Sequence, residues 1–352
     1  MEQKIHEGGL SAVLSRRIKL KFALLSAIPL VALAFLLARG VYSTDSSDQP
    51  LRQTSTAENP EYHITRLTGF RFIRPLFAAK PAAEFPGYLK IKSSVEDLIK
   101  LYQDKGVLAS AAVYLRDFDK SNWIAVNPRE QFTPGSIIKI PVLMTILKYD
   151  EDHPGFVDGR MEYSHRFVLP EKMQQSIVGK QIEIGKTYSR RQLLQSMIEY
   201  SDNNATQLLW TVMDKESYAN MFAAFGLAKP DVSANELHLT AAECSVFLES
   251  LFNASYLSIP HSEFAVDLLT RSAFDQGFMK GIPGENLLIA HKFGESGSDV
   301  HHQLHETGIV YIDGKPYLIT VMTKGSDRAD LTQLATVIQG ISRTIYYGLT
   351  AK

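Results

Sequence analysis

Cysteine is almost missing from this chain of 352 residues, which contains a single one, Cys244. One cysteine cannot form an internal disulfide, so a disulfide-stapled scaffold is excluded. Its apolar neighbours Val246, Phe247 and Leu248 indicate a buried helical position, where a thiol packs as a small apolar group. Cysteine-based catalysis is therefore not expected.

Net charge is also nearly absent. The 37 Lys and Arg residues are balanced by 38 Asp and Glu residues, and the basic ones are scattered beyond the first 21 positions. Such a chain has no overall field that would gather nucleic acid, so we expect no nucleic-acid partner. With 45% hydrophobic and 21% charged residues, most of the chain has the composition of a globular protein.

One uncharged apolar run is present, from Phe22 to Ala38, and its 17 residues are near the shortest length that spans a bilayer as a helix. Basic residues crowd the N-terminal side of the run, whereas Arg39 stands nearly alone after it, so the positive-inside rule places the N-terminus in the cytoplasm. A cleaved signal peptide is the alternative, but no small-x-small cleavage site follows. We expect a membrane-anchored, single-pass protein whose remainder is extracytoplasmic.

The chain divides into four predicted parts. A basic tail, 1–21, precedes the anchor, 22–40, and the segment 41–90 begins as a stalk rich in Ser, Thr, Asp and Pro and becomes a more apolar extended arm. The remaining segment, 91–352, has the size of one large catalytic domain.

Hydrophobic periodicity predicts the order of elements within that domain. An amphipathic helix and a strand hairpin come first, a long mostly helical stretch with two capping boxes follows, and three strands and a last helix end the chain. The predicted helices are 93–105, 136–251 and 331–347, and the predicted strands are 111–115, 123–126, 287–293, 308–312 and 317–323. This order predicts an α+β fold with a five-stranded antiparallel sheet flanked by the terminal helices, plus an all-helical lobe.

Ser136 and Lys139 are spaced to share one face of a helix that starts at the serine. Burial would lower the lysine pKa enough for the amine to accept the serine proton, and the helix N-terminus would offer backbone N–H groups to an oxyanion. A helix-capping serine beside a surface lysine is an equally good interpretation of this pair alone.

Two further motifs follow along the chain. Ser201-Asp202-Asn203 lies between two predicted helices, where an Asx-type cap for the second helix is the structural alternative. Lys292 and Gly294 end a predicted apolar strand, where an extended substrate has room to pair with the strand edge.

The three motifs, in this order and spacing, resemble the signature of class A β-lactamases and penicillin-binding proteins. The resemblance extends through GKTYSRRQLLQSMIEYSDNNATQLL, HLTAAECSVFLESLF and HETGIVYIDGKPYLITVMTKGSD, from about Ser93 to the C-terminus. It implies a β-lactamase/transpeptidase-like serine hydrolase that opens β-lactam or acyl-D-Ala-D-Ala-like amides and needs no cofactor or metal. We expect it to act as a monomer.

The resemblance also implies a role for each motif residue. Ser136 is the nucleophile, Lys139 accepts its proton and Ser201 relays a proton to the leaving nitrogen. Asn203 holds the substrate amide, whereas Asp202 orders the loop. On the strand, Lys292 supplies positive charge near the substrate carboxylate, Gly294 lets the substrate approach, and the backbone N–H groups of Ser136 and Glu295 form the oxyanion hole.

Two departures from the family pattern bear on the substrate. Phe293 stands where the family usually has a Thr or Ser whose hydroxyl binds the substrate carboxylate, and only Ser296 or Ser298 is near enough in sequence to replace it. The segment 226–240 is too short for the family loop that carries the deacylating glutamate, and Glu236 is a weak candidate for that base.

Three functions therefore remain open: a β-lactamase-like hydrolase, which the wider resemblance favours, a penicillin-binding D-Ala-D-Ala carboxypeptidase-like enzyme with slow deacylation, and a non-catalytic cell-wall-binding module.

His301, His302 and His305 are predicted to lie in a polar turn between strands, and no fourth ligand with matching spacing supports a metal site there.

Overall fold

The computed structural model describes residues 61–67, 76–168, 177, 179–233, 237–284, 287–297, 301–312, 315–327 and 329–351. The predicted cytoplasmic tail, the anchor and most of the stalk lie outside these ranges. Within the described residues, no helix combines the length and the apolar character that crossing a membrane requires.

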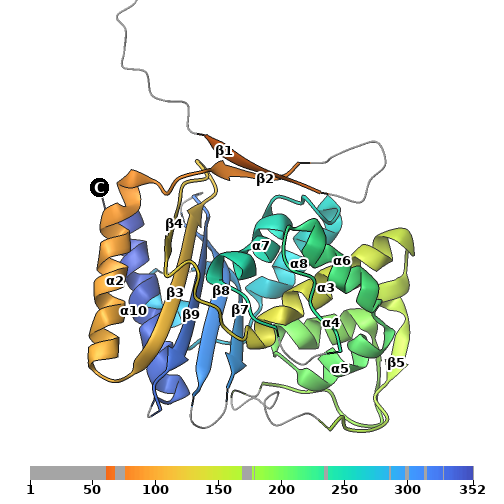
Figure 1. Cartoon of the computed structure of the whole chain (residues 1–352). Coiled ribbons are helices and arrows are strands. Elements are labelled where there is room, and N and C mark those ends of the chain that lie inside the picture. The colour runs from red at the N-terminus through yellow and green to blue at the C-terminus, as the bar shows by residue number, and fades with distance from the viewer. Residues whose placement is uncertain are drawn as a thin grey trace, which may run out of the picture. The chain divides into compact units, whose positions relative to one another are not determined.

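A five-stranded antiparallel sheet forms the centre of the fold (Figure 1). Its spatial order is β4-β3-β9-β8-β7, so β7 lies at one edge and β4 at the other. Each strand of the C-terminal three is longer than the sequence predicts, because polar residues continue the backbone pairing past the apolar run. The strands are β3 (Leu108–Asp117), β4 (Trp123–Val126), β7 (Leu288–Ser296), β8 (Gln303–Tyr311) and β9 (Tyr317–Gly325).

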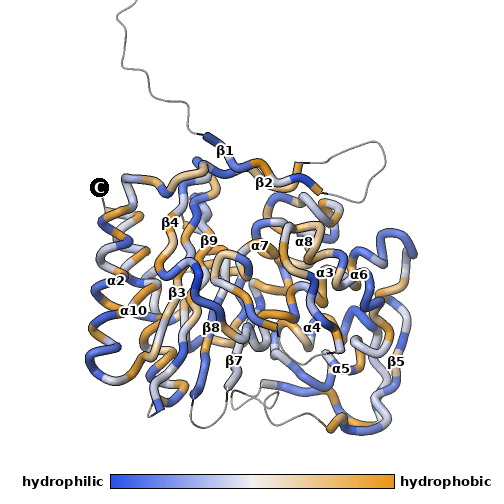
Figure 2. The backbone as a smooth tube through the Cα atoms, in the orientation of Figure 1, coloured by the Kyte–Doolittle hydropathy of each residue, from blue (hydrophilic) through white to orange (hydrophobic). Residues whose placement is uncertain are grey.

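The two terminal helices of the domain cover one face of this sheet. Helix α2 (Leu89–Asp104) packs beside α10 (Leu331–Thr350), and both turn an apolar stripe toward the strands. In Figure 2 both helices carry hydrophilic and hydrophobic colours in alternation, as expected for helices that are solvated on one side. The α+β fold with flanking terminal helices is confirmed.

The other face of the sheet is covered by a helical lobe (Figure 1). The prediction of one helical stretch over 136–251 is wrong in detail, because a small two-stranded sheet interrupts it. Helix α3 ends at Asp152, and Gly155, with a φ of 88°, starts the short 3-10 helix η3 (Phe156–Asp158) that leads into this sheet. The lobe consists of α3 (Lys139–Asp152), β5 (Arg160–Glu162), β6 (Thr187–Ser189), α4 (Arg190–Glu199), α5 (Asn203–Val212), α6 (Lys215–Ala224), α7 (Ala241–Phe252) and α8 (Ile259–Thr270), followed by the short α9 (Phe278–Gly281).

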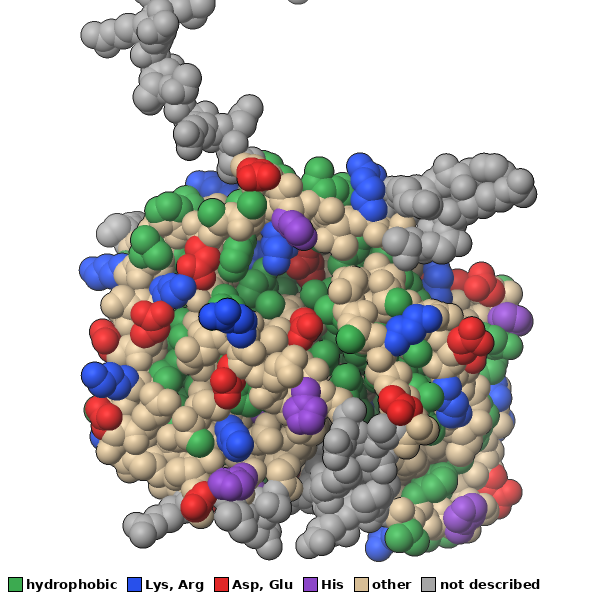
Figure 3. All heavy atoms as spheres, in the orientation of Figure 1, with side chains coloured by type: hydrophobic (Ala, Val, Ile, Leu, Met, Phe, Trp, Pro, Cys, Tyr) green, Lys and Arg blue, Asp and Glu red, His purple; other side chains and the backbone are tan. Residues whose placement is uncertain are grey.

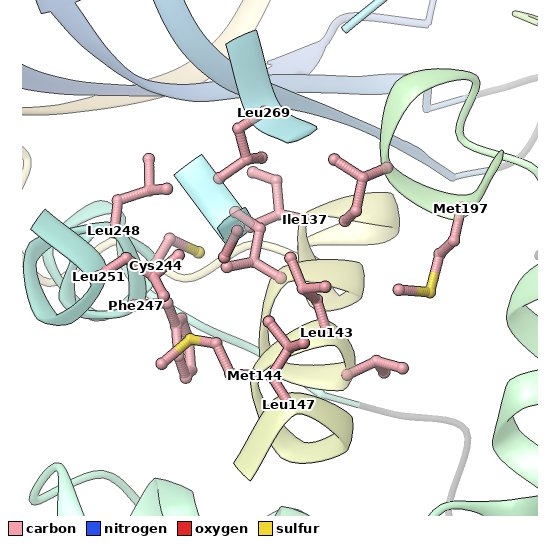
Figure 4. Packing of buried hydrophobic residues seen from close by; sticks show 14 of the residues in the cluster. Ile137, Leu143, Met144, Leu147, Met197, Cys244, Phe247, Leu248, Leu251 and Leu269 are labelled. Carbon is pink, nitrogen blue, oxygen red and sulfur yellow. The ribbon is translucent and has the colours of Figure 1, made fainter. Parts of the chain in front are cut away.

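Both predicted capping boxes are present. The Ser189 side chain accepts from the Gln192 backbone N–H, and the Gln192 side chain accepts from the Ser189 backbone N–H at the start of α4. Thr240 and Glu243 make the same pair of bonds at the start of α7. Cys244 on α7 is fully buried, as predicted, and this burial raises the pKa of its thiol. Figure 4 shows its sulfur among the leucines and Phe247 that pack α7 against α3.

The extended arm forms a hairpin outside the main sheet. Strand β1 (Tyr62–Arg66) pairs with β2 (Leu76–Pro81), and the following residues run to the exposed edge of β4. There the Trp123 indole N–H donates to the Pro81 carbonyl at 2.7 Å, and the Phe85 backbone N–H donates to the Trp123 carbonyl at 2.9 Å. The arm therefore protects an edge strand that would otherwise expose its backbone groups.

Candidate active site

Ser136 lies on a short 3-10 helix, η2 (Gly135–Ile138), that continues directly into α3. The next residue, Ile137, is fully buried in the lobe core, and Figure 4 shows it close to α3 and Leu269. Apolar packing on both sides of the turn thus fixes the serine at the start of a buried helix, as predicted, although its first turn is 3-10 and not α.

Lys139, one turn further on, has its amine inside the protein. Its Nζ donates to the Ser201 carbonyl at 2.6 Å, to Ser201 Oγ at 3.0 Å and to Asn203 Oδ1 at 2.7 Å. Burial lowers the Lys139 pKa to about 7, and the carboxylate of Asp202 opposes that shift in part. An amine with such a pKa is a competent general base near neutral pH.

The loop between α4 and α5 brings the second motif to this amine. Ser201 has a φ of 55°, unusual for a residue with a side chain, and this turn directs it toward Lys139. Asp202 caps α5 by accepting from the N–H groups of Asn204 and Ala205, and its other oxygen accepts from Ile182 N–H at 2.7 Å. The predicted role of Asp202 in ordering the loop agrees with these contacts.

The third motif lies inside β7 and not at its end, because the strand extends to Ser296. At Gly294 a Cβ would come within 2.2 Å of the Pro134 carbonyl oxygen, so only glycine lets β7 approach the chain before η2 this closely. The sequence predicts room for a substrate at Gly294. In the structure, its missing side chain makes room for the protein's own backbone.

A second close approach joins η2 to β7. Gly135 has a φ of 55°, and a Cβ there would lie 2.4 Å from the Glu295 carbonyl oxygen and 2.9 Å from its nitrogen. The backbone that carries Ser136 is therefore in contact with the backbone of Glu295. The two N–H groups that the sequence predicts for an oxyanion hole therefore belong to backbone segments that lie against each other.

Phe293 packs on the side of the sheet that α2 and α10 cover, away from Ser136. It belongs to the core cluster on the α2 and α10 side of the sheet, where its ring stacks on that of Phe274 with centroids 4.4 Å apart. Lys292 precedes it in the strand, and its Nζ donates to the Phe293 carbonyl and lies 4.1 Å from the centroid of the Phe293 ring. Burial and the nearby Lys139 lower the pKa of Lys292 well below that of a free lysine.

His305 is a site residue that the sequence did not reveal. The prediction that it lies in a polar turn is wrong, because β8 already begins at Gln303 and the His305 side chain is fully buried. Its Nδ1 accepts from Thr323 N–H, so its Nε2 carries the proton and donates to the Thr133 carbonyl at 3.0 Å. Ser296 Oγ donates to the same carbonyl at 2.8 Å, and together they fix the turn that leads to Ser136.

The structure brings together the side chains that the sequence assigned to chemistry. The four side chains are all buried, with exposed fractions of 6%, 2%, 2% and 0% for Ser136, Lys139, Ser201 and Lys292. Glu236 and Ser298 lie outside the described residues. Ser296, the other predicted replacement for the missing hydroxyl, is committed to Thr133.

Charge on the described surface is mixed in sign. In Figure 3 basic and acidic side chains are interspersed over the face shown. Among the described residues, no group of three His, Cys, Asp or Glu side chains is placed to hold a metal ion.

A buried serine and lysine at the start of a helix, beside a second serine and the edge strand of an antiparallel sheet, are groups that serine acyl-transfer chemistry can use. Residues 90–349 match the sequence model of the beta-lactamase enzyme family. Because this match covers most of the chain, the protein belongs to that family. A search of curated proteins gives no match.

Solved structures share the fold over about three quarters of the chain. An acyl-enzyme complex of a variant of PBP-A with penicillin G is 18% identical, with a TM-score of 0.60 and coverage of 74% of this chain and 96% of the other. A β-lactamase from Chitinophaga pinensis is 16% identical (TM-score 0.63, coverage 74% and 100%). A class A β-lactamase from Mycobacterium abscessus is 20% identical (TM-score 0.61, coverage 73% and 100%).

Proposed function

We propose that the protein is a serine acyl-transfer hydrolase that opens β-lactam amide bonds through an acyl-enzyme on Ser136. The observation that carries this proposal is the buried Lys139 amine bonded to Ser201 and Asn203. Family membership supports a serine hydrolase of this superfamily, and the PBP-A variant was solved as an acyl-enzyme with penicillin G.

In the proposed reaction, the proton lost by Ser136 is replaced by one delivered to the leaving nitrogen from within the site. Ser136 Oγ attacks the amide carbonyl while neutral Lys139 takes the hydroxyl proton, and the N–H groups of Ser136 and Glu295 stabilise the oxyanion. The C–N bond then breaks, and Ser201, which is hydrogen bonded to Lys139, passes a proton to the leaving nitrogen. Asn203 holds the substrate amide. Water later cleaves the ester and restores the serine.

A second candidate is a penicillin-binding, D-Ala-D-Ala carboxypeptidase-like enzyme that deacylates slowly. It is supported by the likeness to PBP-A, a variant of which was solved as an acyl-enzyme complex with penicillin G.

Mass spectrometry of the intact full-length chain in detergent, mixed with a penicillin and followed over time, separates these functions. An adduct that forms and clears while penicillin is consumed in excess over protein supports the hydrolase, and a persistent adduct supports the second candidate. An adduct that forms equally on Ser136→Ala, or on neither form, contradicts both and leaves the non-catalytic module.

We also propose that the chain is anchored in a membrane by residues 22–40, with the N-terminus in the cytoplasm and the hydrolase domain outside. The uncharged run and its one-sided basic flank support this proposal. We expect the full-length protein to sediment with membranes and to resist extraction at alkaline pH. Replacing Leu33 and Leu36 with arginine should release it, and release of the native protein by alkali alone would contradict the proposal.

A further inference from the structure

One carboxylate in the core of the sheet takes no part in the proposed reaction. Glu306 lies in the middle of β8, and its side chain is completely buried. Its Oε2 accepts from the Phe278 N–H at the start of α9 at 2.8 Å, and its Oε1 lies 2.6 Å from His291 Nδ1 on β7. Burying a carboxylate is costly even when both of its oxygens are hydrogen bonded, so an opposite charge is expected nearby.

The register of the sheet places Glu306 beside the third motif. Glu306 pairs with Phe293 on β7, so the two side chains lie on the same face of the sheet. Lys292 directly precedes Phe293, and its Nζ lies 4.1 Å from the centroid of the Phe293 ring and donates to the Phe293 carbonyl. The amine and the carboxylate are therefore on neighbouring strands, close enough to interact through the low dielectric of the core.

The Lys292 amine needs such a charge to stay protonated. Burial and the nearby Lys139 lower the Lys292 pKa, whereas Glu306 raises it. The ionisable groups that bear on the pair come from three elements: Lys139 from α3, Glu306 from β8, and His291 from β7, which is bound to Glu306. In the proposed reaction Lys292 supplies positive charge, and the charge of Glu306 favours that state.

We propose that Glu306 is a positioning residue of this site, and that its buried carboxylate is the counter-charge that keeps the Lys292 amine protonated. This inference rests on the proposed function, in which Ser136 is acylated beside a cationic Lys292. Glu306 acts through Lys292 and takes no part in making or breaking bonds. His291 and the Phe278 N–H hold the carboxylate where its charge acts on the amine.

The pH dependence of acylation separates a counter-charge from a purely structural role. Lys139 must be neutral and Lys292 protonated, so the rate should rise through the Lys139 pKa of about 7 and fall again at higher pH, where Lys292 loses its proton. The measurement is the rate of adduct formation with benzylpenicillin on the full-length protein between about pH 5 and 10.5.

Glu306→Gln keeps the shape of the side chain and removes its charge. The alkaline limb of the profile should therefore move to lower pH by about one unit, while the acid limb, which belongs to Lys139, stays in place. A rate that drops equally at every pH, with both limbs where they are in the native protein, would mean that Glu306 is only structural and would overturn the inference.

Two variants control for this substitution. Glu249→Gln removes the charge of another buried carboxylate, the partner of Arg116, and should leave the alkaline limb in place. An equal movement in this variant would overturn the role of Glu306. His291→Asn keeps an N–H donor for Glu306 without the imidazole, and the limb should again stay. Movement to higher pH would mean that a charged His291 neutralises Glu306, which would also overturn the counter-charge.

Lys292→Arg tests the inference without a change at Glu306, and so does not depend on the folding of Glu306→Gln. A guanidinium keeps its charge over the whole pH range, so the fall in rate at alkaline pH should disappear. Persistence of the fall would show that the limb does not belong to Lys292, and the inference would be wrong.

The outcomes also separate the inference from the proposed function. A native protein that forms no adduct at any pH contradicts the proposed function and the inference together. Adduct formation on the native protein, with the same alkaline limb in Glu306→Gln, overturns the inference and leaves the proposed function supported.

Discussion

At the scale of single residues, the burial of Lys139 lowers the pKa of its amine. Its amine is shielded from solvent and its pKa is lowered to about 7, mainly by desolvation. Because the proposed base is the neutral amine, the acylation rate should rise with pH through about 7 and level off above it. The measurement is the rate of adduct formation between about pH 5 and 9, and a flat profile would contradict a lysine base.

The charge of Asp202 influences the midpoint of this pH profile. Its carboxylate raises the Lys139 pKa, against the larger effect of burial. Asp202→Asn removes that charge, so the midpoint of the acylation profile should move to lower pH. A shift to higher pH would contradict the assignment. The variant Asp214→Asn, which changes the cap of α6 in the same way, serves as the matched control and should leave the midpoint in place.

Lys139 also makes the stability of the fold depend on pH. Its pKa in the folded state is below that of a free lysine, so between about pH 7 and pH 10 the unfolded chain binds more protons than the folded one. The free energy of unfolding therefore gains a contribution as the pH rises through this window. Lys139→Met should remove that contribution, which is visible in urea unfolding at about pH 7 and pH 9.

His305 is a positioning residue in our interpretation. Burial lowers its pKa to about 4, so it is neutral and joins Thr323 N–H to the Thr133 carbonyl at neutral pH. His305→Phe leaves the buried Thr323 N–H without this acceptor, at a cost of about 1–3 kcal/mol in unfolding free energy. It should also slow acylation, because the turn before Ser136 loses a donor.

The comparison of His305→Phe with Ser296→Ala separates stability from positioning. The serine variant removes the second donor to the Thr133 carbonyl but leaves Thr323 bonded. It should slow acylation with a smaller loss of stability. If both variants lose stability and acylate at the native rate, the Thr133 turn does not position the nucleophile.

The sequence predicts the candidate reacting residues better than the residues that position them. Ser136, Lys139 and Ser201 are recognised because their order and spacing follow a known pattern. His305 is not, because its role depends on the register of β8 against β9, where Leu304 pairs with Thr323. A run of polar residues, HHQLHET, gives no local signal that its last part is a buried strand.

At the scale of elements, the contact between β7 and η2 depends on two glycines. Gly294→Ala places a methyl group where the Pro134 carbonyl lies, so β7 must withdraw and carry the Glu295 N–H away from Ser136. We expect a loss of about 1–3 kcal/mol in unfolding free energy together with a large drop in the acylation rate. Urea unfolding and adduct formation on the same preparation measure the two effects.

Gly106 supplies the control for Gly294. It has a φ of 71°, and a Cβ there would have nothing within 4 Å, so Gly106→Ala strains the backbone without a clash. This variant should lose stability and acylate at the native rate. If Gly294→Ala does the same, close approach of β7 is not what the reaction needs.

Element boundaries follow the sequence where a capping box marks them and depart from it elsewhere. Ser189 and Thr240 begin helices as predicted because side chains next to the backbone decide where a helix starts. The small sheet of β5 and β6 was missed because each of its strands has three residues. Strands that short leave no periodicity to detect.

At the scale of the whole molecule, one buried ion pair joins the sheet, the helical lobe and the arm. Arg116 on β3 donates from Nη1 to the Glu249 carboxylate on α7 and from Nη2 to the Ala79 carbonyl in β2. Arg116→Met leaves Glu249 buried and unpaired, which should cost about 3–5 kcal/mol. The double variant Arg116→Met/Glu249→Leu should recover most of that loss in urea unfolding.

Recovery in the double variant would show that the pair serves to neutralise Glu249 and not to add net stability. A double variant as unstable as the single one would instead mean that the Arg116 contact with the arm is the important one. Acylation should be near native in the double variant, because neither residue lies in the elements that carry Ser136, Lys139 and Ser201.

The complete burial of Cys244 turns the chain's scarcity of thiols into an experimental advantage. A reagent that modifies thiols meets one target, and that target is sealed between α7 and α3 while the lobe is folded. The rate at which this thiol is modified under native conditions therefore reports how often the helical lobe opens, and no label has to be introduced. Acylation of Ser136, which lies on η2 directly before α3, should therefore change the rate at which this thiol is modified.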